Sequence, residues 1–121
     1  MWIDPEIFLL FAVAEGVDLF DCVLPTRMAR HNTLYTLEGR VNILNAEWAD
    51  HDGPVDPESV FLQTERYSAA YLRHLFRAGE PLGPRLATLH NLCFYSRLMT
   101  ELRAAIRDGT WPQLVARYAL A

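Results

Sequence analysis

A chain of 121 residues and 13.9 kDa has room for one modest domain or for a part of a larger one. Hydrophobic residues make up 51% of the chain and charged residues 21%, which excludes a disordered protein. The formal net charge of -4 excludes a generally basic nucleic-acid-binding surface, although a local basic patch remains compatible with it.

Cysteine content and hydropathy indicate the compartment. Cys22 and Cys93 are too few for a disulfide framework, and we expect both to be small, buried side chains in a reducing compartment. The chain has no run of about 18 apolar residues, so we expect no membrane span and no membrane partner. The apolar stretch at residues 7–14 lacks the basic flank of a signal peptide. The sequence therefore favours a cytoplasmic protein.

The first predicted elements are a helix and a strand. Asp4 and Pro5 form a typical helix start, and Gly16 ends that helix. Residues 17–24 are apolar on both faces apart from two aspartates and end at Pro25, which predicts a buried strand. A helix followed by a buried strand is typical of α/β proteins with a parallel sheet.

A polar, basic segment at residues 26–32 is predicted to be a loop. Residues 33–37 and 40–44 flank Glu38 and Gly39, which predicts a hairpin with a tight turn. Such a hairpin is antiparallel, so it offers the preceding strand no parallel partner. Because an isolated buried strand has unpaired backbone groups on both edges, the sequence indicates the end of something larger.

The second half of the chain is predicted to be mainly helical. Residues 49–58 contain several turn residues and are predicted to be a loop, and helices are expected over residues 65–78, 84–108 and 111–118. The long helix has an apolar stripe with alternating spacings of three and four, which is typical of a core face. The stripe consists of Leu92, Tyr95, Met99, Leu102 and Ile106, and Leu86, Leu89, His90 and Cys93 continue it.

Residues 16–27, which read GVDLFDCVLPTR, resemble the active-site segment of the tRNA-guanine transglycosylases, also called queuine tRNA-ribosyltransferases. The resemblance continues in order, without large gaps, over essentially the whole chain. It is carried further by Arg30, Glu38-Gly39, Asn42-Ile43, Asn45-Ala46, Asp56-Pro57-Glu58, Tyr67-Ser68, residues 70–75 and 86–88, His90-Asn91-Leu92, Phe94-Tyr95 and Leu98-Met99.

This resemblance implies an α/β fold, namely the C-terminal portion of a (β/α)8 TIM-type barrel with a β-hairpin and a helical subdomain. Residues 1–32 would be the last barrel helix and strand with the catalytic loop. Residues 33–83 would be the hairpin and a degenerate zinc-subdomain segment, and residues 84–121 the C-terminal helices. A full barrel needs about 250 residues, so the chain resembles a fragment. An N-terminal barrel portion, with the guanine pocket and a second catalytic aspartate, is the implied partner.

By the same resemblance, Asp21 stands at the position of the catalytic nucleophile. In the family, a carboxylate attacks C1′ of the anticodon guanosine, guanine leaves, and a deazaguanine base attacks the covalent intermediate. This is the double displacement of retaining glycosidases applied to an N-glycoside. The predicted strand places Asp21 near its C-terminal end, where barrel enzymes keep their catalytic groups. Without the resemblance, an ordinary aspartate at a strand end is the alternative.

Arg27 and Arg30 match arginines that engage the tRNA anticodon loop in the family. Guanidinium groups bind phosphates or base edges in this way. The family has a glycine shortly after the second arginine, whereas this chain reads His31 and Asn32 there. A solvated basic turn is the alternative interpretation.

The family's zinc site is predicted to be lost, so we expect no cofactor. Its three cysteine positions correspond to Ser59, Phe61 and Thr64, none of which replaces a thiolate, and only His90 is retained. We expect Phe61 to fill the volume of the metal site, next to His90 and Cys93. A two-ligand remnant of His90 and Cys93 and a hydrogen-bonded core histidine beside a small thiol are the two interpretations, and the second is favoured.

Tyr67, Tyr71 and His74 match aromatic positions of a homodimer contact in bacterial family members. An internal amphipathic stripe is the alternative.

Three functions follow: the C-terminal segment of a tRNA-guanine transglycosylase, inactive by itself; a non-catalytic tRNA-binding or dimerisation module; or an inactive remnant. The base that is inserted cannot be identified from this segment.

Overall fold

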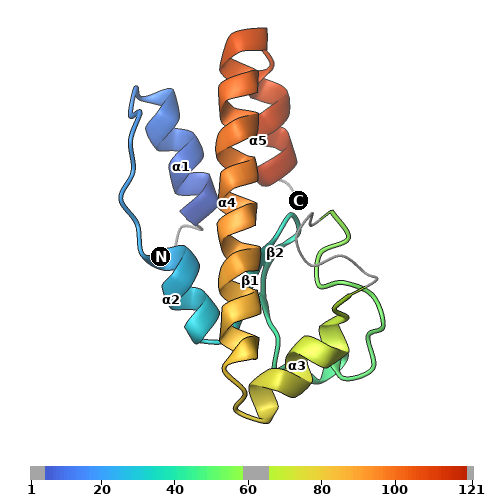
Figure 1. Ribbon diagram of the computed structural model, residues 1–121. Helices are drawn as coiled ribbons and strands as arrows, with labels where there is room; N and C mark the ends of the chain where they lie inside the picture. Colours follow the sequence, from blue (N-terminus) through green and yellow to red (C-terminus); the bar gives the residue numbers. More distant parts are fainter. Residues whose placement is uncertain (1–4, 59–65, 120–121) are drawn as a thin grey trace. The chain divides into compact units, whose positions relative to one another are not determined.

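The computed structural model, drawn in Figure 1, describes residues 5–58 and 66–119. The chain divides into two compact units. Unit 1 combines Met1–Cys22 with Tyr95–Ala121, and unit 2 is Val23–Phe94. The helix α4 (Leu82–Asp108) contributes its first half to unit 2 and its second half to unit 1. Within the described residues, no helix combines the length and the apolar character needed to cross a membrane.

Unit 2 contains a hairpin whose pairing confirms the sequence prediction. Strands β1 (Thr33–Thr36) and β2 (Gly39–Asn42) pair antiparallel, with Thr33 opposite Asn42 and Thr36 opposite Gly39. The turn is Leu37 and Glu38, one residue earlier than expected. Gly39 begins β2 with a φ of 116°, a conformation that only glycine adopts at no steric cost.

Helix α3 (Ala69–Arg77) begins four residues later than the predicted start at residue 65. Its start is set by Ser68, whose side-chain oxygen accepts a hydrogen bond from the Tyr71 backbone N–H at 3.1 Å. Its inner face joins the apolar core of unit 2. That core consists of Ala29, Leu34, Ile43, Val55, Ala69, Leu72, Leu75, Leu86 and Ala87.

Unit 1 is built from helices. Helices α1 (Pro5–Ala14) and α5 (Trp111–Ala119) contact each other, and both confirm the sequence prediction. The core of this unit contains Leu10, Leu98, Leu102, Ala105, Leu114 and Tyr118.

The predicted core stripe of the long helix is partly wrong. Leu102 is buried, but 45% of Leu92 and 61% of Ile106 are exposed. The buried face includes Leu86, His90 and Leu102 of the predicted stripe, and it also includes Ala87, Asn91, Leu98 and Ala105, which the stripe omits. Small and polar residues occupy part of this face, so a pattern drawn through the large apolar side chains follows it only in part.

The predicted buried strand at residues 17–24 is wrong in this structure. Residues 17–23 have no regular secondary structure, and Leu19 is 90% exposed. Cys22 is exposed as well, against the expectation of burial, and Cys93 is half-buried. A strand needs a neighbour for its backbone groups, and among the described residues the two-stranded antiparallel hairpin is the whole sheet. The parallel sheet of an α/β fold is therefore absent from the described part of the chain.

Candidate functional site

Asp21 lies in unit 1, on the segment between α1 and α2. Its side chain is exposed, as is that of Asp18 on the same segment. The predicted strand, whose C-terminal end was expected to hold Asp21, is not formed in this structure. The carboxylate is accessible to a reactant from solvent, which a nucleophile requires.

Arg27 and Arg30 lie in unit 2 on helix α2 (Leu24–Arg30), so the predicted loop over residues 26–32 is wrong for residues 26–30. Pro25 lies in the first turn of the helix, where its missing N–H costs nothing. Pro25 and Ala29 are buried, one turn apart, and Ala29 belongs to the unit 2 core. Arg27 and Arg30 lie on the opposite, exposed side. With only two small residues facing the core, seven residues give too short a pattern to indicate a helix.

The two arginines are in the last turn of α2, where positive side chains interact favourably with the helix dipole. The His31 ring nitrogen Nδ1 contacts the Arg27 carbonyl at 2.8 Å. Asn32 follows with a φ of 65°, the left-handed conformation that asparagine tolerates best after glycine. Asn32 thus accommodates the turn in which the family resemblance leads one to expect a glycine.

His90 lies on α4 and is 2% exposed. Its Nε2 is 2.7 Å from the carbonyl oxygen of Tyr35, so this nitrogen carries the proton and donates. Burial lowers the pKa of the His90 imidazole below its usual 6.5, opposed by the Tyr35 carbonyl and by the Asp56 carboxylate. His90 is thus a buried, hydrogen-bonded histidine in this structure, whereas the Cys93 thiol three residues further on is half-buried.

Only one of the four positions that correspond to the family's zinc ligands, His90, lies among the described residues. Ser59, Phe61 and Thr64, and with them the expected inward orientation of Phe61, lie outside the described residues. Within the described ranges, no three His, Cys, Asp or Glu side chains are grouped to hold a metal ion. A serine, a phenylalanine and a threonine do not fit a zinc site built for three thiolates, and Nε2 of His90 is used by Tyr35.

Asn91, beside His90, is a buried residue that the sequence analysis noticed only as part of the resemblance. It is 0% exposed. Its Oδ1 accepts from the Tyr35 N–H at 3.0 Å, while Nδ2 donates to the carbonyls of Pro25 at 2.9 Å and Thr33 at 3.0 Å. The sequence feature that could have indicated this role is a polar amide on the same helix face as His90 and Ala87.

The aromatic residues of the expected dimer contact are partly exposed. The rings of Tyr67 and Tyr71 stack, with centroids 6.1 Å apart and planes 16° apart. Tyr67 packs against the unit 2 core, whereas Tyr71 and His74 are exposed on α3. An entirely internal stripe is therefore excluded for two of the three residues.

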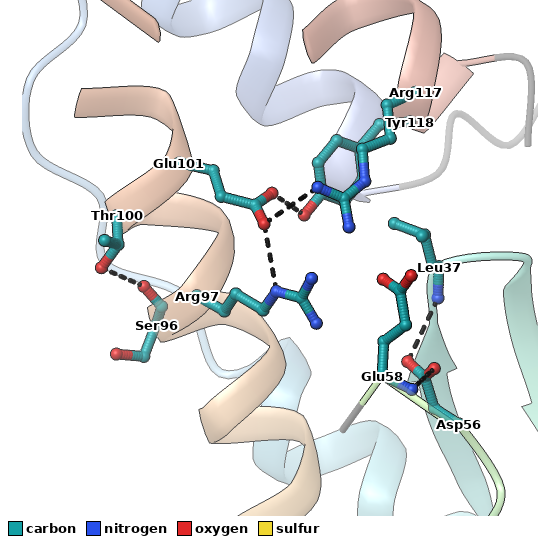
Figure 2. Close-up of polar contacts among 9 residues, drawn as sticks. All are labelled: Leu37, Asp56, Glu58, Ser96, Arg97, Thr100, Glu101, Arg117 and Tyr118. Carbon is teal, nitrogen blue, oxygen red and sulfur yellow. Dashed lines mark hydrogen bonds and ion pairs between the residues drawn. The ribbon is translucent and has the colours of Figure 1, made fainter. Parts of the chain in front are cut away.

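A polar cluster in unit 1 was not predicted from the sequence. Figure 2 shows the Glu101 carboxylate of α4 facing Arg97, Arg117 and Tyr118. The carboxylate accepts from Arg97 Nε at 3.0 Å, from an Arg117 terminal nitrogen at 3.3 Å and from the Tyr118 hydroxyl at 2.5 Å. Burial and the bond to Glu101 raise the pKa of Tyr118. These contacts hold α5 on α4.

A second carboxylate with a structural role lies in unit 2, also drawn in Figure 2. Asp56 accepts from the backbone N–H of Glu58 at 3.0 Å and from that of Leu37 at 3.4 Å. It therefore fastens the hairpin turn to the loop that precedes the undescribed residues 59–65.

Comparison with known proteins identifies the family of the chain. Residues 3–121 match the family model described as Queuine tRNA-ribosyltransferase. The chain belongs to this family and matches a C-terminal part of it.

Three curated relatives named queuine tRNA-ribosyltransferase show the extent of the similarity. The one from Thiobacillus denitrificans is 51% identical over 91% of this chain and 30% of its own length. The one from Caulobacter vibrioides is 45% identical over 98% of this chain and 32% of its own length. The one from Herpetosiphon aurantiacus is 57% identical over 81% of this chain and 25% of its own length. The chain thus spans less than a third of these relatives.

Proposed function

We propose that this chain is the C-terminal segment of a tRNA-guanine transglycosylase, which exchanges the anticodon guanine of a tRNA for a deazaguanine in queuosine modification. The observation that carries the proposal is the family match over residues 3–121, with relatives of that name 45% to 57% identical. The family match spans the stretch 16–27 that contains Asp21.

In the proposed reaction, a carboxylate oxygen of Asp21 forms a bond to C1′ of the ribose while the bond from C1′ to guanine breaks. The departing guanine takes up a proton, and the incoming deazaguanine attacks C1′, loses a proton and releases the carboxylate. Two displacements at one carbon retain its configuration. The exposure of Asp21 supports this role, because the target guanosine has to be turned out of its stack to reach it.

The proposed partner of this chain is the N-terminal barrel portion of the family, which would supply the guanine pocket and the second catalytic aspartate. The relatives are about three times as long as the matched segment. Phe8, Phe11, Val17 and Leu19 of unit 1 are exposed apolar side chains. Burying a side chain of this size stabilises by about 1.5 to 3 kcal/mol, so these residues favour a covering polypeptide.

Arg27 and Arg30 are the proposed contacts to the tRNA anticodon loop, and cytoplasmic tRNA the proposed substrate. Both guanidinium groups are exposed, and neither forms an ion pair within residues 5–58 and 66–119. Because the chain has a net charge of -4, its surface as a whole repels a polyanion. Any RNA affinity therefore depends on a local basic group of this kind.

Complementation tests the catalytic part of the proposal. The chain alone should not incorporate labelled guanine into tRNA, and co-expression with an N-terminal barrel portion from a relative should restore incorporation. In the restored complex, Asp21→Asn should abolish incorporation with little change in tRNA binding. Asp18→Asn removes an exposed carboxylate of the same segment and serves as the matched control. Activity of the chain alone, or activity retained by Asp21→Asn, would contradict the proposal.

A second candidate, a non-catalytic dimerisation module, is favoured by the exposed side of α3. Tyr71 and His74 are exposed next to the stacked Tyr67. If they form an interface between copies, sedimentation should show a dimer that Tyr71→Ala and His74→Ala weaken. A monomer at all accessible concentrations would rule out this role for the chain alone.

A further inference from the structure

The outer side of β1 is covered by the side chains of a helix. The Ile43 N–H donates to the Asn32 carbonyl at 2.9 Å. Because the backbone groups of an antiparallel strand alternate in direction, those of Leu34 and Thr36 face β2, and those of Thr33 and Tyr35 face away from it. His90 and Asn91 of α4 bond three of these outward groups: the Thr33 carbonyl and both backbone groups of Tyr35.

Asn91 differs from His90 because it reaches a second element. One Nδ2 hydrogen bonds the Thr33 carbonyl on β1, and the other bonds the Pro25 carbonyl in the first turn of α2. Both amide hydrogens and the amide oxygen are therefore used, as burial of a polar side chain requires. A single side chain thus fastens α2 to β1.

Helix α2 depends on such a contact more than a longer helix would. An isolated helix of seven residues is not stable in water, so its position is set by tertiary contacts. On its buried side, α2 offers the core only Pro25 and Ala29, both small. Arg27 and Arg30 point away from that side, and their direction follows the orientation of the helix.

We propose that Asn91 is a positioning residue for RNA binding: its amide fixes α2 on β1 so that Arg27 and Arg30 are presented together to the RNA. This inference rests on the proposed function, in which these arginines contact the anticodon loop. Asn91 itself is buried in unit 2 and touches no RNA.

A double-mutant cycle on RNA binding tests the inference. Asn91→Asp keeps the size of the side chain and an oxygen for the Tyr35 N–H, but removes both Nδ2 donors. With a fluorescent anticodon stem-loop RNA at low salt, the variant should bind about tenfold more weakly than the parent chain. In the Asn91→Asp background, the pair Arg27→Ala and Arg30→Ala should change affinity by less than about twofold, because the arginines are already misplaced.

His90→Leu is the matched control, since it removes a buried bond from the same helix turn to β1 without touching α2. It should lower stability yet leave RNA affinity within about twofold of the parent. Amide hydrogen exchange should show lost protection at the α2 amides Arg27 and Arg30 in Asn91→Asp only. If Asn91→Asp does not fold, as judged by circular dichroism, Asn91→Ser takes its place in the same cycle.

The two failures are distinguishable. If the arginine pair lowers affinity by the same factor with and without Asn91, or if His90→Leu weakens binding as much as the Asn91 variant, the positioning role is overturned and the RNA role of α2 stands. If the arginine pair leaves affinity unchanged in the parent chain, the RNA role of α2 is overturned, and this inference with it.

Discussion

Replacing both Arg27 and Arg30 by alanine should flatten the salt dependence of RNA binding by a calculable amount. Each phosphate contact in a single-stranded region contributes about 0.7 to the slope of log affinity against log salt concentration. Both guanidinium groups are exposed and unpaired within the described ranges, so two contacts give a change of about 1.4. Between about 50 and about 200 mM salt, the parent chain should therefore lose about sevenfold more affinity than the variant.

The assay is fluorescence anisotropy of an anticodon stem-loop RNA titrated with the chain over a series of salt concentrations. The control pair Arg77→Ala and Arg85→Ala removes the same charge from two exposed arginines of unit 2 that lie outside α2. Its slope should stay close to that of the parent. Equal flattening by both pairs would show that net charge, rather than α2, governs binding, and the reasoning would fail.

Three further predictions concern stability. Because burial lowers the pKa of His90 in the folded chain, the unfolded chain binds a proton more readily than the folded chain does. The free energy of unfolding should therefore be highest above pH 6.5 and decrease below it. Chemical unfolding at several pH values should show this decrease, and His90→Leu should remove it. Leu34→Ala, at a fully buried position, should lower the free energy of unfolding in urea by about 2 to 5 kcal/mol. Leu92→Ala, at a half-exposed position, should lower it by less than about 1 kcal/mol. Similar losses in the two variants would contradict the described core. We also propose that the chain holds no structural zinc. Elemental analysis should then find far less than one zinc per chain, and a chelator should leave the melting temperature unchanged. Stoichiometric zinc would refute this proposal.

The sequence predicted the elements whose signals are local. Gly39 between two alternating segments located the hairpin, and Asp4, Pro5 and Gly16 located the first helix. The long helix was predicted from its periodicity, but its buried face was located only in part because Ala87 and Asn91 contribute no large apolar side chain. Such a pattern reports size and hydropathy, and a buried amide has neither signal.

The failures come from interactions between distant residues. Helix α2 depends on its contact with Asn91, 66 residues from Pro25, which no local pattern contains. Residues 17–24 have the composition of a buried strand, yet a strand also needs neighbours to pair with, and these are absent from the described residues. Asp21 and the two arginines came from the family resemblance alone, and their roles stay predictions.

The covering of β1 by His90 and Asn91 also limits how this small sheet can aggregate. An open strand edge is a template on which strands of other molecules add, the first step towards amyloid-like assembly. Here three of the backbone groups of β1 that face away from β2 are bonded to side chains of α4, which hinders strand addition on that side and leaves the side of β2 as the open edge. That remaining edge has an exposed arginine, Arg40, and charges of this kind oppose strand addition. The two sides of the hairpin are thus defended by different means, one by covering and one by charge.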